Sequence, residues 1–267
     1  MYQSVRVAVL FGGQNTKHAV SVVTNLDRSR YRVIPVRIAA DGRWSAGFGT
    51  PDGPIDESVL RLLTPDHPPG VSVAESLFAT IGVILREADL VFPVLHGVHG
   101  EDGTVQNLLD QAGIRYVGNP AAACATAMDT ALTRRILTAR GIAADGAVIG
   151  RDIDVGVLET PDGHLIASAP RETGDLAVPA GLDQDTTARL KGTAVRVFRE
   201  LGCAGMLHVG FVVAPDSTVS VKQVSTMPGM ASGSRFPLMW TAGGISYTEL
   251  LDILIRTARR GKIDATT

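Results

Sequence analysis

The stretch from 91 to 118, VFPVLHGVHGEDGTVQNLLDQAGIRYVG, constrains the fold of this chain more than any other segment. Residues 91–95 form a short apolar run, which is typical of a buried strand. A polar, glycine-rich turn follows, and apolar residues then recur at helical spacing over 105–112. A glycine ends this predicted helix, and 114–117 predicts the next short strand. The stretch therefore indicates one unit of an open α/β sheet.

The turn between this strand and this helix is a candidate ligand site. Open α/β sheets bind ligands where a strand ends and a helix begins. Unpaired N–H groups and a partial positive charge at a helix start attract a carboxylate or a phosphate. Glu101 and Asp102 also fit a plainer role, in which their carboxylates satisfy the helix start. The pattern alone leaves both interpretations open.

The composition excludes several kinds of partner. The chain has 267 residues, enough for one large or two modest domains, and 45% of them are hydrophobic. With a net charge of −2 and no basic, aromatic-interleaved stretch, we expect no nucleic-acid partner. No apolar run has membrane-spanning length and no signal-peptide core precedes the first strand, so we expect a cytoplasmic protein with no membrane partner. Cys124 and Cys203 are predicted to be buried free thiols.

The first part of the chain predicts a doubly wound sheet. Residues 5–11 form an apolar run that ends at a glycine pair, and a helix is expected to begin within 19–26. The full G-x-G-x-x-G dinucleotide fingerprint is absent. A strand is predicted at 31–38, and a helix within 71–87.

The second part predicts two hairpins and two long helices. A Thr-Pro-Asp-Gly turn separates the strands of the first hairpin, and a Pro-Asp turn separates those of the second. Asn119 and Pro120 are expected to cap and begin a helix, and Asp183 is expected to cap another. The predicted strands are 152–158 with 164–168 and 206–213 with 218–224, and the helices are 128–140 and 183–201.

The pattern LHGxxGEDGTxQxLLxxAGIxYVG within the first stretch resembles the segment that closes the N-terminal domain of the D-alanine–D-alanine ligases, bacterial peptidoglycan enzymes of the ATP-grasp superfamily. Gly12, Gly13, Val20 and Ser21 fit the family's opening VxxLxGGxSxExxVS. The segment 226–232 follows its NTxPGMTxxS loop.

The resemblance implies an α/β fold with a reduced second half. An N-terminal doubly wound, Rossmann-like pre-ATP-grasp domain is expected at 1–120. Residues 121–149 are expected to form a helical connection where the nucleotide-binding subdomain is missing. An α+β ATP-grasp remnant is expected at 150–267.

Several features that the family uses for ATP chemistry are absent. The flexible Gly/Ser-rich flap, the acidic hinge strand and the FYDYxxKY closing loop have no counterpart, and the phosphate-binding lysine position is Thr130. Where the family has an arginine and three metal ligands, this chain has His208, Gly210, Gln223 and Ser225. Mg²⁺ relies on carboxylate and phosphate oxygens, so we expect no metal site and no ATP or Mg²⁺ cofactor.

The substrate side of the family site is better preserved. His96 matches the histidine at the substrate carboxylate, and the Gly229 backbone and Ser234 match substrate contacts, with Ser21 nearby in the opening motif. Lys17 replaces the glutamate that receives the first amino group, and its cation would repel an ammonium group.

Three functions are compatible with this sequence. The chain is expected to be a pseudoenzyme or scaffold that binds a small carboxylate-bearing or amino-acid-like molecule, as a homodimer like many members of the family. Alternatively, it is an ATP-independent enzyme with His96, His208, Lys17 and Lys222 as acid–base candidates. The third possibility is a residual ATP-dependent ligase, with a partner chain supplying the missing subdomain.

Overall fold

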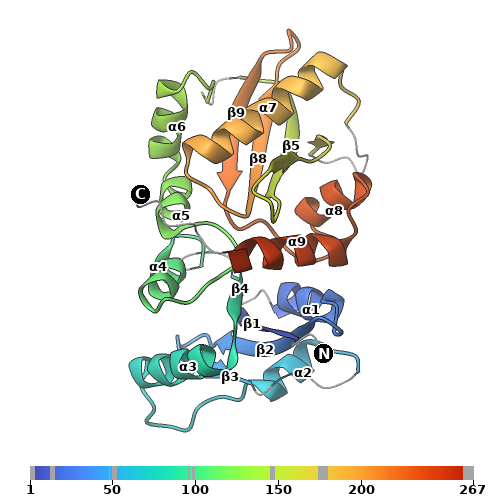
Figure 1. Cartoon of the computed structure of the whole chain (residues 1–267). Coiled ribbons are helices and arrows are strands. Elements are labelled where there is room, and N and C mark those ends of the chain that lie inside the picture. Colours follow the sequence, from blue (N-terminus) through green and yellow to red (C-terminus); the bar gives the residue numbers. More distant parts are fainter. Residues whose placement is uncertain are drawn as a thin grey trace.

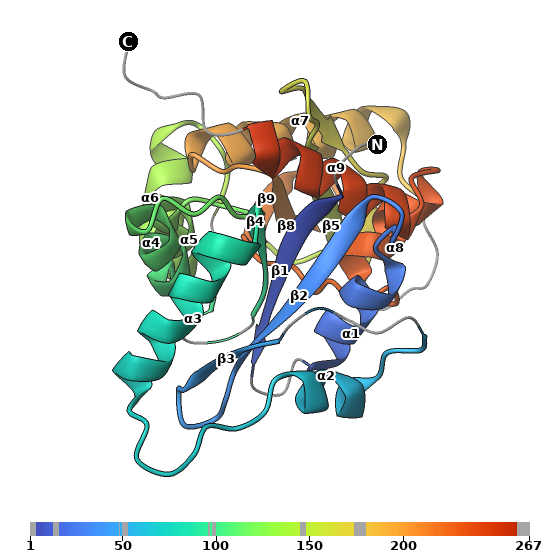
Figure 2. The ribbon, with the colours of Figure 1, turned by 60° about the horizontal axis from the view of Figure 1, so that its bottom comes forward.

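A computed structural model describes residues 4–12, 16–47, 49, 53–95, 97, 100–144, 148–173 and 180–260 of the chain. Two α/β halves are stacked, each with its own sheet, and the helix α9 (Tyr247–Arg260) runs between them (Figure 1). In Figure 2 the strands of the first sheet run side by side below α9. This architecture confirms the predicted α/β fold class.

The N-terminal sheet has four strands in the order β3-β2-β1-β4. The central strand β1 pairs in parallel with β2 and β4, whereas β3 is antiparallel to β2. The strands are β1 (Val5–Gly12), β2 (Tyr31–Ile38), β3 (Trp44–Ala46) and β4 (Leu90–Val94). The helices of this half are α1 (Thr16–Asn25), α2 (Glu57–Leu63), α3 (Val73–Glu87) and α4 (Thr104–Gln111).

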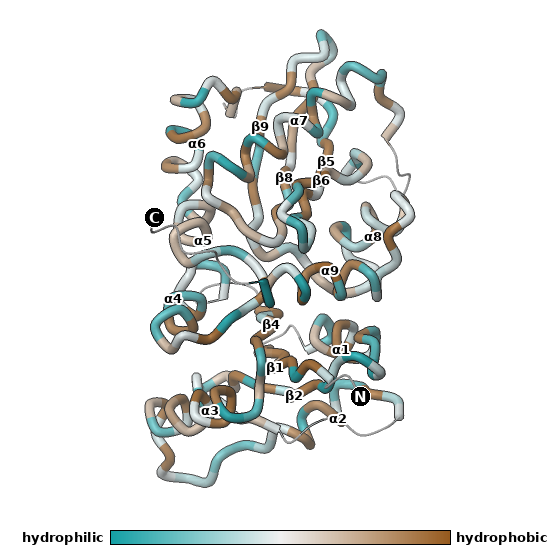
Figure 3. The backbone as a smooth tube through the Cα atoms, viewed as in Figure 1, coloured by the Kyte–Doolittle hydropathy of each residue, from teal (hydrophilic) through white to brown (hydrophobic). Residues whose placement is uncertain are grey.

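Both faces of this sheet are buried. Along β1, Val7, Val9 and Phe11 enter one apolar cluster, while Ala8 and Leu10 enter another on the opposite face. Successive side chains of a strand point to opposite faces, so an uninterrupted apolar run is what a sheet covered on both sides requires. The tube in Figure 3 is accordingly coloured hydrophobic along β1 and β2.

The C-terminal sheet is antiparallel and has the order β6-β5-β8-β9, with β7 also paired to β5. The long helix α7 (Gln184–Glu200) lies across one face of it (Figure 1). Its apolar stripe packs against alternate residues of the central strands. The strands are β5 (Arg151–Glu159), β6 (Leu165–Ala167), β7 (Arg171–Glu172), β8 (Met206–Val213) and β9 (Val219–Ser225).

The connection between the halves differs from the sequence prediction in one helix. The helix predicted over 128–140 is present but begins at Thr130, because Asp129 leaves the helical conformation and accepts a hydrogen bond from the Leu132 N–H at 2.9 Å. An aspartate satisfies the start of a helix better than it serves in a helix interior. The helices are α5 (Ala121–Met128) and α6 (Thr130–Ala139), and α8 (Arg235–Ala242) precedes α9.

The predicted capping role of Asn119 is wrong. Its side-chain amide donates to the carbonyl oxygens of Met206 at 2.6 Å and Thr226 at 2.8 Å, and its oxygen accepts from the Ala204 N–H at 2.9 Å. Pro120 is the residue that precedes the helix. This buried side chain makes hydrogen bonds with three backbone groups, whereas a helix cap would give it only one. Asn119 therefore attaches the connection to the C-terminal half.

Three further sequence predictions concern a short strand, a helix cap and the two cysteines. The predicted strand at 114–117 makes a single bridge, between Val91 and Tyr116. Asp183 caps α7 as predicted, and both cysteines are free, with Cys124 buried and Cys203 partly exposed. Among the residues that the structure describes, no helix is long and apolar enough to cross a membrane.

Candidate functional site

A hollow of about 370 Å³ lies beside the face of the C-terminal sheet that α7 leaves uncovered. It combines the ends of β8 and β9, the loop that follows β9, and the first turn of α8. Its lining is rich in glycine and polar side chains and consists of His208, Ser225, Pro228, Gly229, Gly233, Ser234, Arg235 and Phe236.

Strand alternation explains which side chains reach this hollow. In β8, Leu207 and Val209 belong to the core beneath α7, so His208 and Gly210 face the other way. The β8–β9 register places His208 directly opposite Ser225, and Gly210 opposite Gln223. The positions at which the resemblance locates an arginine and three metal ligands therefore meet on one face.

Gly210 sits in a crowded position. A Cβ atom there would lie 2.9 Å from Cγ of Gln223 and 3.6 Å from Oδ1 of Asp154. The first distance is too short for real Cβ contacts, so a larger residue would have to displace the Gln223 side chain. The side chains of the neighbouring strands occupy the space that a residue with a side chain would need.

Asp154 is a site residue that the sequence reasoning missed. It lies opposite Gly210 on β5 and is almost completely buried. Its Oδ1 is 3.0 Å from Nε2 of His208, and its Oδ2 accepts a hydrogen bond from the Thr173 hydroxyl at 3.2 Å. The Arg235 guanidinium lies 3.6 Å from the same Oδ2. The carboxylate is thus held from three directions.

The electrostatics keep this carboxyl group ionised. Burial opposes ionisation of Asp154, but the hydrogen bond and charge of His208, with contributions from Arg235 and Thr173, outweigh it and lower the pKa. The His208 Nε2 is buried, and the Asp154 Oδ1 at 3.0 Å is its close polar neighbour. The alternating polar positions of the predicted strand 152–158 placed Asp154 on a polar face, but they did not indicate its partner.

The loop after β9 brings Gly229 and Ser234 together. A Cβ at Gly229 would come within 3.1 Å of Ser234 Oγ and 3.6 Å of the His18 ring. Ser234 occupies the cap position of α8, yet its hydroxyl makes no capping hydrogen bond. Its hydroxyl and the first-turn N–H groups of α8 are therefore placed to bind a ligand in the hollow. His18 was not among the predicted site residues.

The other predicted site residues are located elsewhere. Ser21 accepts a hydrogen bond from the Ser232 N–H at 2.8 Å, so it supports the loop and does not line the hollow. Lys17 is exposed on α1 and is also absent from the lining. Lys222 forms an ion pair of 2.7 Å with Asp152 away from the hollow. His96 lies outside the described residues.

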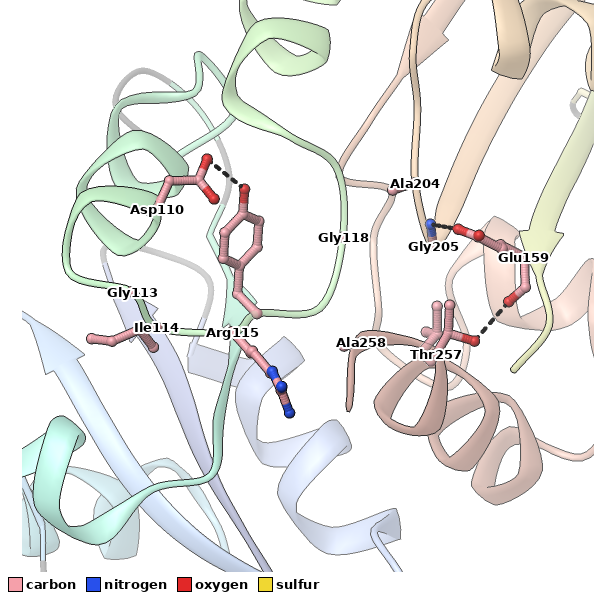
Figure 4. A pocket seen from close by; sticks show the side chains of 12 residues that line it. Asp110, Gly113, Ile114, Arg115, Gly118, Glu159, Ala204, Gly205, Thr257 and Ala258 are labelled. Carbon is pink, nitrogen blue, oxygen red and sulfur yellow. Dashed lines mark hydrogen bonds between the residues drawn. The ribbon is translucent and has the colours of Figure 1, made fainter. Parts of the chain in front are cut away.

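A second hollow, of about 430 Å³, lies at the seam between the two halves (Figure 4). None of the predicted site residues lines it. Its polar groups contact each other: the Tyr116 hydroxyl donates to Asp110 at 3.0 Å, and Glu159 accepts from the Gly205 N–H at 2.9 Å. Each of these two contacts, drawn as a dashed line in Figure 4, lies within one half, and they face each other across the hollow.

The residues present do not form a fitting Mg²⁺ site. Among the described residues, no cluster of three or more histidine, cysteine or acidic side chains could hold a metal ion. Gly210 offers no oxygen and Gln223 no charge, and Asp154, the carboxylate next to them, is already paired with His208. Mg²⁺ requires hard anionic oxygen ligands, which this arrangement does not provide.

Two family models together match most of the chain. The model described as D-ala D-ala ligase N-terminus matches residues 6–119, and D-ala D-ala ligase C-terminus matches 117–256. The chain is 32% identical to the D-alanine--D-alanine ligase of Mycolicibacterium smegmatis, with 95% of each covered. That alignment extends over 355 positions, although this chain has 267 residues, so the relative contains internal residues that this chain lacks.

Solved structures show the same fold. The D-alanine-D-alanine ligase of Coxiella burnetii superposes with a TM-score of 0.78 at 23% identity, covering 96% of this chain and 94% of that one. The enzyme of Bacillus anthracis complexed with ATP superposes with a TM-score of 0.68 at 19% identity, covering 96% and 98%.

Proposed function

Because this chain belongs to the D-alanine–D-alanine ligase family, we propose that it binds a small carboxylate-bearing, amino-acid-like molecule and has given up ATP-dependent ligation. The ligand occupies the hollow beside β8 and β9. The single observation that carries this proposal is the contrast within the hollow, where substrate-side groups remain but the metal-side carboxylates are replaced.

Carboxylate binding is supported by the groups that line the hollow. The Ser234 hydroxyl, the Gly229 backbone and the first turn of α8 provide hydrogen-bond donors at one end. The Arg235 guanidinium and the His208 ring lie close by. Donors at a helix start combined with a cation form a suitable environment for a small anion.

The loss of ATP chemistry is supported by what surrounds Gly210. Transfer of a phosphoryl group needs cations that bridge the phosphate oxygens and residues that hold those cations. Asp154 is the carboxylate beside this position, and its contacts with His208 and Arg235 engage it already. The internal residues that the relatives have in addition are missing from this chain, so they cannot hold such cations here.

Calorimetric titration with Mg·ATP, with and without D-alanine, tests both parts of the proposal. We expect no heat on addition of Mg·ATP, and a raised melting temperature with D-alanine or a comparable small carboxylate. The Ser234→Ala variant is expected to lose this stabilisation, because a hydroxyl donor at the hollow is removed. Ser232→Ala, in the exposed part of the same loop, is the matched control and is expected to retain it.

Two outcomes would overturn the proposal. Heat on binding Mg·ATP together with phosphate release in the presence of D-alanine would establish a ligase. Absence of stabilisation by any small carboxylate across a concentration series would remove the binding function.

An ATP-independent enzyme is the second candidate. It is favoured by one observation, the close contact between the buried Asp154 carboxylate and the His208 ring at the edge of the hollow. A histidine held by a buried carboxylate is a frequent acid–base arrangement.

A further inference from the structure

Three chemically different side chains lie side by side on the open face of the C-terminal sheet. Asp154 belongs to β5, His208 to β8 and Ser225 to β9, and these strands are neighbours in that order. The register places Asp154 opposite Gly210 and His208 opposite Ser225, so all three side chains project from the same face. A carboxylate, an imidazole and a hydroxyl therefore follow one another across the sheet.

We propose that Ser225, His208 and Asp154 act as nucleophile, general base and positioning carboxylate in the hydrolysis of a small carboxylic ester bound in the adjoining hollow. The proposal deepens the second candidate function and rests on the hollow assigned above to a carboxylate-bearing ligand. It requires neither nucleotide nor metal.

Asp154 meets the requirements of the positioning carboxylate. It is buried, it stays ionised, and its Oδ1 is 3.0 Å from the His208 Nε2. The Thr173 hydroxyl fixes its other oxygen. A carboxylate at one ring nitrogen fixes the orientation of the imidazole and stabilises the imidazolium that forms when the other nitrogen accepts a proton. No described residue hydrogen-bonds the His208 Nδ1.

Ser225 is within reach of that second nitrogen. Directly opposed residues on antiparallel strands have Cβ atoms about 5 Å apart. A change of the Ser225 rotamer can then bring its Oγ to hydrogen-bond distance from the His208 ring, a contact that often forms only when substrate is bound. Both residues line the hollow, and Ser225 is only partly buried.

The first turn of α8 can stabilise the developing negative charge. The backbone N–H groups of Arg235 and Phe236 belong to the helix start, where intrahelical acceptors are lacking. Both residues line the hollow together with Ser225. Donors at a helix start, supported by the Arg235 guanidinium, form the kind of anion-stabilising environment that acyl transfer requires.

The chemical steps balance with water as the co-reactant. The Ser225 Oγ bonds to the ester carbonyl carbon while its proton moves to His208. The carbon–oxygen bond of the ester then breaks, and the alcohol leaves with that proton. Water, deprotonated by His208, attacks the acyl-serine, and the carboxylic acid departs as Ser225 regains its proton.

A fluorophosphonate probe tests the nucleophile directly. The protein is incubated with the probe, and the adduct is located by intact mass and peptide mapping. We expect one adduct, on Ser225, that is lost in Ser225→Ala and retained in the control Ser232→Ala. Hydrolysis of p-nitrophenyl acetate is expected to fall about 100-fold or more in Ser225→Ala.

The Asp154→Asn variant tests the positioning role through the pH profile. Among the described residues, Asp154 from β5 contacts His208, Arg235 from α8 contacts Asp154, and His18 from α1 lies near the Gly229 loop of the same hollow. Removing the Asp154 charge destabilises the imidazolium, so the acid limb of kcat/KM should move to lower pH as the rate falls. A merely structural role would lower the rate without moving that limb. Melting curves establish that each variant is folded.

The proposal is overturned by the absence of a Ser225 adduct in the folded protein, or by equal ester hydrolysis in the wild type and Ser225→Ala. Either result leaves the carboxylate-binding proposal standing if D-alanine still raises the melting temperature. Loss of that stabilisation in the wild type would instead indicate failure of the hollow itself.

Discussion

The two sheets of this protein are covered in different ways. The N-terminal sheet is buried on both faces, and the apolar run of β1 supplies a core on each side. The C-terminal sheet has an apolar core under α7, whereas its other face is covered only in part, where Phe236 and Trp240 of α8 pack against Gly156. Beside that contact lies the polar series of Asp154, His208 and Ser225. In such a sheet, alternate residues of each strand have different roles. The residues under α7 maintain the fold, and the residues on the other face can change.

This difference accounts for one group of the chain's departures from its family. The positions where the resemblance locates metal ligands, including Gly210 and Gln223, lie on the open face of the C-terminal sheet. Their replacement leaves the apolar residues under α7 in place. Functional residues of such a site can be exchanged at little cost in packing.

The largest expected effect contrasts the two faces of the C-terminal sheet. Phe211 is fully buried under α7, so Phe211→Ala should lower the free energy of unfolding by about 3–5 kcal/mol. Gln223→Ala on the open face should change it by less than about 0.5 kcal/mol. Urea denaturation measures both. Similar losses for the two variants would show that the open face is part of a packed core.

A second prediction concerns the fastening between the halves. Asn119→Ala should cost about 3 kcal/mol, since buried backbone groups of Ala204, Met206 and Thr226 lose their partner. The exposed Asn107→Ala in α4 is the control and should have little effect. Unfolding followed separately by tryptophan fluorescence and circular dichroism tests whether the halves still unfold together. An unchanged midpoint would contradict the role of Asn119.

The smallest effect depends on pH. The folded-state pKa of Asp154 is lowered, so the stability that its carboxylate contributes is present above its unfolded pKa and is lost as pH falls through the folded pKa. Asp154→Asn should therefore reduce stability by about 2 kcal/mol at neutral pH. The gap between the two proteins should close in acid, below the ordinary carboxyl pKa of about 3.9. A gap that is constant down to strong acid would contradict this, and the exposed Asp185→Asn is the control.

Much of the fold was predictable because its elements are locally encoded. The strand at 31–38 and the cap at Asp183 followed from periodicity and turn chemistry and were confirmed. The helix predicted over 128–140 was found as α6 and begins only two residues later, because Asp129 caps it. The cap predicted at Asn119 was wrong, because its partners are distant in the sequence and invisible to any local pattern.

The candidate site likewise combines residues that motifs predicted with a residue that only strand pairing reveals. Gly229, Ser234 and His208 were identified through motifs, and the structure brings them to one hollow. Lys17 and Ser21 belong to the same opening motif but do not line it. Asp154 had no motif, and its importance depends on the register of β5 against β8.

The sequence by itself determined the family, most of the longer helices and strands, and which residues stand where the resemblance locates metal ligands. Each of these depends on residue identity at a position or on local periodicity. Only the tertiary structure decided that Asp154 meets His208 opposite Ser225, and that α7 leaves this face open. Strand pairing joins segments far apart in the chain, and a shift of the register by one residue would turn these side chains to the other face.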